Sequence, residues 1–201
     1  MKKICAALLI SSGIPFAMAQ ADDTDVLKLR LAQLPQFEAQ FNQQAFDFDN
    51  NLVQQSAGHV ALQAPLKFVW EQRDPEPLQL ISDGEAVWFY DPYVEQVTVS
   101  NVDDAISQTP LSLLSSQDPA IWARWNVVQA QECFTLTDTQ ASDVQMQVCF
   151  NDEVISKLQL VDAQGTRTTM LLTDFTTELA QSSQFHFTPP EGTYIDDQRH
   201  Q

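Results

Sequence analysis

The chain has 201 residues, of which 27 are acidic and 10 are basic, and its formal net charge is −17. Such a charge repels phosphate backbones, so nucleic acid is not expected as a partner. The length fits a single domain with one well-formed core.

The first twenty residues are typical of a secretory signal peptide. Two lysines, an apolar run over 4–10 and the triplet Ala17-Met18-Ala19 provide its basic region, its apolar region and its cleavage site. We expect cleavage after Ala19, so that residues 1–19 are the signal peptide and residues 20–201 form one domain. Removing the two lysines takes the net charge from −17 to −19. The alternative is an uncleaved anchor, but the apolar run is too short to span a membrane.

The mature part is expected to open with a helix and continue in strands. Thr24 or Asp25 can cap the helix and Pro35 ends it, with one apolar stripe formed by Val26, Leu27, Leu31 and Leu34. Period-two alternation then predicts strands over 37–43, 56–62 and 66–71.

Residues 78–93 predict a β-hairpin. Asp83-Gly84 separates two apolar runs, and Asp-Gly favours a type I′ turn, in which both central residues have positive φ. The run 87–90 is apolar on both faces. We therefore expect a sheet that is packed on both sides or wraps around an apolar ligand.

The segment 101–115 lacks a strand pattern, and 118–124 predicts a short helix with Pro119 in its first turn. Both are candidates to cover the sheet rather than extend it.

Two cysteines remain after processing, and they lie in adjacent predicted strands. Pairing Cys133 with Cys149 in an antiparallel hairpin sets Phe134 opposite Val148 and Leu136 opposite Met146. The compartment of an exported protein is oxidising, so we expect a Cys133–Cys149 disulfide, with a reduced pair as the alternative.

Further strands are expected over 154–160, 170–175 and 185–187, followed by a short tail over 194–199. The total is about eleven strands. Their short connections make them mostly antiparallel.

No catalytic motif stands out, and the histidines are scattered. No enzyme activity, metal or cofactor is therefore expected. The surplus of apolar residues on the strands is explained either by an ordinary core or by an apolar cavity, and composition leaves both open.

Several segments of the chain resemble the LolA family of periplasmic lipoprotein carriers. The resemblance covers nearly the whole mature chain and rests on Phe37-x-Ala39-x-Phe41-x-Gln43, Pro65-x-x-Phe68-x-Trp70, the stretch 82–96, Thr109-Pro110-Leu111, the ending 185–192 and Asp196-Asp-Gln-Arg199.

The resemblance implies an incomplete antiparallel β-barrel, mainly β, covered by a lid of short helices. Lipoprotein acyl chains would bind between barrel and lid. The implied lid residues are Leu31, Leu111, Leu113 and Leu114. The implied cavity wall is Phe37, Phe41, Val60, Leu62, Phe68, Trp70 and Phe89.

The resemblance also implies partners and a location. The cargo would be triacylated lipoproteins, loaded in the periplasm by a LolCDE-type inner-membrane transporter and delivered to a LolB-type outer-membrane receptor by a monomeric carrier. Family members commonly carry Arg before the proline that is Pro65 here, where it helps to hold the lid closed. This chain has Ala64, so no lid latch is assigned there. A lipid-sensing domain and a periplasmic hydrolase remain as alternative functions.

Overall fold

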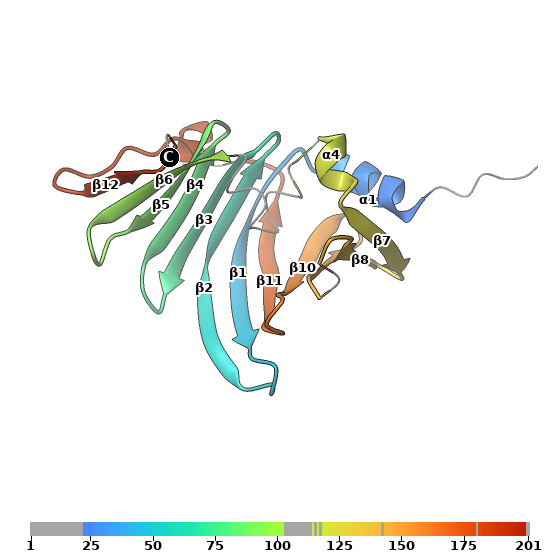
Figure 1. Ribbon diagram of the computed structural model, residues 1–201. Helices are drawn as coiled ribbons and strands as arrows, with labels where there is room; N and C mark the ends of the chain where they lie inside the picture. Colours follow the sequence, from blue (N-terminus) through green and yellow to red (C-terminus); the bar gives the residue numbers. More distant parts are fainter. Residues whose placement is uncertain are drawn as a thin grey trace, which may run out of the picture.

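The computed structural model describes residues 22–102, 114, 116, 118–141, 143–179 and 181–199. Within them, one twelve-stranded sheet carries the helices α1 (Asp23–Ala32) and α4 (Pro119–Trp122) on one side (Figure 1). The strands are β1 (Gln36–Phe46), β2 (Leu52–Gln63), β3 (Lys67–Asp74), β4 (Leu78–Asp83), β5 (Ala86–Asp91), β6 (Gln96–Asn101), β7 (Trp125–Ala130), β8 (Cys133–Asp138), β9 (Gln145–Asn151), β10 (Val154–Val161), β11 (Arg167–Thr176) and β12 (Tyr194–Asp197).

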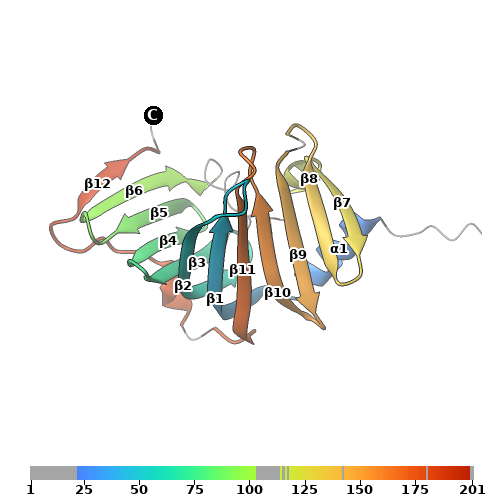
Figure 2. The ribbon, with the colours of Figure 1, turned by 90° about the horizontal axis from the view of Figure 1, so that it is seen from below.

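The sheet is open rather than closed. Its strand order is β12-β6-β5-β4-β3-β2-β1-β11-β10-β9-β8-β7, and among the described strands β12 and β7 form unjoined edges. Figure 2 shows the sheet curling from one edge to the other. The predicted incomplete antiparallel barrel is therefore confirmed. The count is twelve rather than about eleven, because β7 and β12 are additional strands whereas the strand expected over 185–187 does not form; β12 pairs with β6 in parallel.

Helix α1 starts two or three residues earlier than its sequence predicts. Asp22 is the N-cap, and its carboxylate accepts a hydrogen bond from the backbone N–H of Thr24 at 3.3 Å. Neither Thr24 nor Asp25 is the cap. Leu27 and Leu31 are the buried residues of the helix, as the apolar stripe predicts.

The β4–β5 hairpin forms, but its turn differs from the predicted type I′ turn. Strand β4 ends at Asp83 and β5 begins at Ala86, so the turn residues are Gly84 and Glu85. Of these two, only Gly84 has a positive φ, at 96°. Asp83 is the last residue of β4. Its carboxylate accepts hydrogen bonds from the N–H groups of Glu85 and Ala86, both at 2.8 Å, and so stabilises the turn.

The cysteine hairpin has the predicted register. Cys133 lies opposite Cys149, Phe134 opposite Val148 and Leu136 opposite Met146. The two sulfurs form a disulfide.

The two faces of the sheet are buried by different parts of the chain. The inner face packs against α1, and its cluster holds Leu27, Leu31, Phe37, Phe41 and Phe134. The outer face of β2–β6 is covered by the segment that follows β11. There Phe185 packs on Ala61, Val69 and Ile81, while Phe187 lies against Trp88 and Tyr90. The strand predicted over 185–187 is wrong: Ser182–Phe185 is a 3-10 helix, and the chain crosses the sheet there instead of joining it.

Within the described residues, no helix has both the length and the apolar character needed to cross a membrane.

Candidate functional site

The predicted wall residues come together on the inner face of the sheet. Cross-strand pairing sets Phe37 opposite Leu62, Leu62 opposite Phe68 and Val60 opposite Trp70. Directly opposed residues point to the same side of a sheet. The rings of Phe41 and Trp70 also stack on this face, with centroids 5.4 Å apart.

Phe89 lies on the same face but away from the helices. It pairs with Leu80 on β4 and Thr98 on β6, and it is 41% exposed, whereas Phe37 and Phe41 are 1% exposed.

A cavity of about 360 Å³ lies between α1, α4 and the start of the sheet. Of the predicted lid residues, Leu31 and Leu114 line it. Leu111 and Leu113 lie outside the described residues. The other lining residues are Lys28, Ala32, Leu34, Pro35, Ala64, Ser116, Pro119 and Trp122. None of the predicted wall residues is among the residues that line it.

The lining residues that sequence reasoning missed share one property. They come from segments far apart in the chain, and each is ordinary in its own segment. Of these residues, Trp122 was the one that the sequence could best have indicated, because it is a large apolar side chain on a short helix predicted to cover the sheet.

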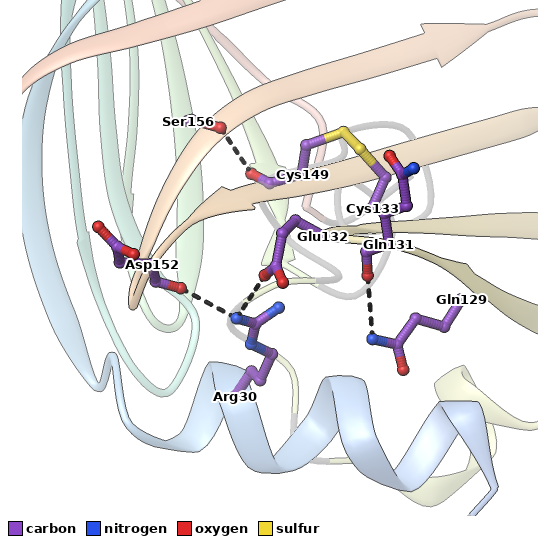
Figure 3. A network of polar contacts seen from close by, with 8 residues as sticks. All are labelled: Arg30, Gln129, Gln131, Glu132, Cys133, Cys149, Asp152 and Ser156. Carbon is purple, nitrogen blue, oxygen red and sulfur yellow. Dashed lines mark hydrogen bonds and ion pairs between the residues drawn. A yellow bond between two sulfur atoms is a disulfide. The ribbon is translucent and has the colours of Figure 1, made fainter.

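Ala64 lines this cavity, and its N–H donates to the carbonyl of Pro35 at 2.7 Å. Helix α1 is also anchored to the sheet by Arg30. Its side chain reaches the β7–β8 turn and the β9–β10 turn, beside the disulfide (Figure 3). Its Nη2 donates to the Glu132 carboxylate at 2.8 Å and to the carbonyl of Asp152 at 2.9 Å.

Two further contacts strengthen this anchor. The Arg30 guanidinium lies 4.4 Å from the ring centroid of Phe150, within the range of a cation–π interaction. At the other end of the helix, the Asp23 carboxylate accepts a hydrogen bond from the N–H of Gln129 on β7 at 2.9 Å. Helix α1 is therefore tied to the β7–β10 half of the sheet at both ends.

Helix α4 is anchored through its buried tryptophan and through the arginine that follows it. Trp122 is 4% exposed, and its Nε1 donates to the carbonyl of Ser116 at 3.0 Å. Arg124 donates to the buried carboxylate of Asp138 from Nε at 2.9 Å and from Nη2 at 2.5 Å. The hydrogen bond from Arg124 holds the pKa of Asp138 below its ordinary value, although burial acts in the opposite sense.

Replacing Arg30 with Met should loosen α1. We expect the free energy of unfolding to fall by about 1–2 kcal/mol, because two charge-assisted hydrogen bonds and a cation–π contact are lost. Amide exchange of α1 should quicken. Arg73→Met is the matched control, since Arg73 pairs with Glu71 on the surface and an exposed pair contributes about 0–1 kcal/mol. Unchanged exchange in α1 of Arg30→Met would contradict the anchor.

Asp138 should make stability depend on pH in the acid range. Its pKa is lowered on folding, so its contribution is full above the pKa of the unfolded chain, about 4, and is lost as the pH falls. Denaturant titrations between neutral pH and pH 3 should show a smaller loss of stability for Asp138→Asn than for the wild type. Glu71→Gln, at an exposed ion pair, should keep the wild-type slope. Equal slopes for the wild type and Asp138→Asn would refute the role of Asp138.

Comparison with known proteins identifies the family. The family model described as "Outer membrane lipoprotein carrier protein LolA" matches residues 32–188. An outer-membrane lipoprotein carrier protein of Shewanella loihica is 36% identical over 199 residues, covering 98% of this chain and 94% of that protein. The carrier protein of Pseudoalteromonas translucida is 34% identical, covering 98% of each chain.

A solved structure supports the fold alone. An uncharacterized conserved protein from Thermus thermophilus superposes with a TM-score of 0.55 at 11% identity, covering 88% of this chain and all of that one. The full-length sequence matches carry the assignment, and the resemblance seen in the sequence is confirmed. The chain belongs to the LolA family of outer-membrane lipoprotein carrier proteins.

Proposed function

We propose that this chain carries outer-membrane lipoproteins, with their acyl chains held between the inner face of the sheet and the helices α1 and α4. The observation that carries the proposal is the match, over nearly the whole chain, to proteins named as lipoprotein carriers. An apolar sheet face under two short helices supports it. Members of the LolA family are carriers rather than enzymes, and carriage needs no catalytic group.

The residues proposed to contact the acyl chains fall into two groups. The wall is formed by residues of the inner face, with Phe89 at its exposed end: Phe37, Phe41, Val60, Leu62, Phe68, Trp70 and Phe89. The lid is formed by Leu31 on α1 together with Leu111, Leu113 and Leu114.

The cavity is too small for triacylated cargo, so carriage requires the lid to move. A methylene group occupies about as much volume as a water molecule in the liquid, ~30 Å³. The cavity of about 360 Å³ therefore holds on the order of twelve methylenes. Three acyl chains of about fifteen carbons each need several times that volume. We infer that cargo separates the helices from the inner face and takes their place on it.

The energy of acyl-chain burial explains why partners are needed. Burial of one chain of about fifteen methylenes contributes roughly 12 kcal/mol, at about 0.8 kcal/mol each. Three chains exceed the ~18–21 kcal/mol ceiling of non-covalent binding. A soluble carrier therefore cannot extract such cargo from a bilayer unaided. We propose loading by an ATP-driven LolCDE-type transporter and release to a LolB-type receptor.

Export completes the proposal. Residues 1–19 act as a signal peptide that is cleaved after Ala19, and residues 20–201 work in the periplasm as a monomer. The disulfide between Cys133 and Cys149 fits that oxidising compartment.

Release of lipoprotein from membranes tests the proposal. Spheroplasts bearing a newly made, radiolabelled triacylated lipoprotein are incubated with the purified mature protein, with and without ATP hydrolysis. We expect label in the supernatant, in a one-to-one complex, only when ATP is hydrolysed.

Two tryptophan variants locate the binding face. Trp70 lies on the inner face against Phe41, whereas Trp88 lies on the outer face against Phe187, and both are partly buried. Trp70→Ala should reduce the cargo recovered several-fold, because a buried aromatic surface is lost, while Trp88→Ala should not. Circular dichroism confirms that each variant is folded. No release by folded wild-type protein would contradict carriage and favour a sensor role instead.

A further inference from the structure

We propose that the cavity between α1 and α4 binds one single-chain amphiphile whose anionic head group, a carboxylate or a phosphate, pairs with Lys28. This goes beyond the carriage of lipoproteins, because a cavity of about 360 Å³ cannot hold three acyl chains. The ligand would be a free fatty acid or a lysophospholipid, which share one alkyl chain and one anionic group.

The size and lining of the cavity fit one alkyl chain. Its volume of about 360 Å³ lies at the lower end of the ~300–1,000 Å³ typical of small-molecule sites and accommodates on the order of twelve methylenes. Its lining is mostly apolar, from Leu31 and Leu34 on one side and Leu114 and Trp122 on the other.

Lys28 provides the one positive charge among the described residues of this mostly apolar lining. Its Nζ lies 5.3 Å from the centroid of the Trp122 ring, at a distance where a cation–π interaction is favourable. The ring is itself fixed, since Trp122 is buried and its Nε1 is bonded to the carbonyl of Ser116. The ammonium group is therefore held beside the cavity.

The charge of Lys28 is not neutralised by the described part of the chain. No carboxylate among those residues lies within 4.0 Å of its Nζ, whereas Arg30, Arg73, Arg124 and Arg199 each have an ion-pair partner. An ammonium group offers three donors to the oxygens of a carboxylate or a phosphate.

Ser116 adds a second polar group to the same cavity. Its Oγ accepts a hydrogen bond from the N–H of Asp118 at 3.2 Å, and a hydroxyl that accepts one bond can also donate its own hydrogen. The cavity therefore offers apolar side chains to an alkyl chain, and a cation and a hydroxyl group to an anionic head group.

Calorimetric titration of the mature protein tests the site. The probes are dodecanoate, lauroyl-lysophosphatidylglycerol, dodecanol and dodecyltrimethylammonium, with dodecanol below its solubility limit and the others below their micelle concentrations. The two anionic probes should bind with one-to-one stoichiometry and on the order of fivefold more tightly than dodecanol, as expected for a partly exposed ion pair, and the cation should bind least. The tighter of the two anionic probes identifies the source of the ligand.

Variants separate the charge from the cavity. Lys28→Met keeps the aliphatic stem and should bring the affinity for dodecanoate to that of dodecanol. Lys157→Met, on β10 and outside the cavity lining, should bind as the wild type does. Ala64→Phe should fill the cavity and abolish binding of all four probes. Thermal unfolding confirms that the variants are folded.

The proposal is overturned if dodecanoate and dodecanol bind the wild type equally, if Lys28→Met keeps the preference, or if Ala64→Phe still binds the probes. These results are distinguishable from a failure of the carrier proposal. Wild-type protein that releases lipoprotein but shows no preference for anionic probes refutes only this site.

Discussion

The structure depends on one constraint: the inner face of the sheet is apolar, and the sheet does not close into a barrel that would bury this face. Twelve strands curl, yet β12 and β7 remain unjoined edges among the described strands. A fully closed barrel would bury its interior permanently. An open sheet must instead be covered by other elements, and here α1 and α4 cover the inner face while the segment after β11 covers part of the outer face. A cover made of separate elements can be displaced by a ligand.

The two covers are held in different ways, and this difference bears on function. The outer cover packs through Phe185, which is 2% exposed, and through Phe187 against two aromatic side chains. The inner cover includes a cavity, and polar contacts tie its helices to the β7–β10 side through Arg30 and Arg124. Because the cavity leaves part of the inner cover without packed apolar contacts, we expect the inner cover to yield first. Cargo would then meet the aromatic side chains of the inner face.

Much of the fold could be predicted because both faces of a strand constrain it. In the cysteine hairpin one register satisfied Phe134, Leu136 and the two cysteines together, so the pairing could be stated before the structure. Phe185 and Phe187 alternate just as strand residues do. Their role became clear only from packing, since a crossing segment and a strand share the same period. The β4–β5 hairpin was predicted, but its turn was placed one residue too early. The turn pattern does not include the hydrogen bond that the Asp83 side chain accepts from Glu85.

The candidate site could be predicted less completely. The wall residues follow from alternation and share a face as expected, but the cavity arises where α1 meets α4, and no local pattern contains that contact. Lys28 is an ordinary lysine in its own helix.

The most direct test of the account maps where the acyl chains lie, by photo-crosslinking from a diazirine in the acyl chains of a bound lipoprotein. The account predicts labelling of inner-face residues such as Phe41 and Trp70, and of α1. Labelling confined to the outer face around Phe187 would contradict it.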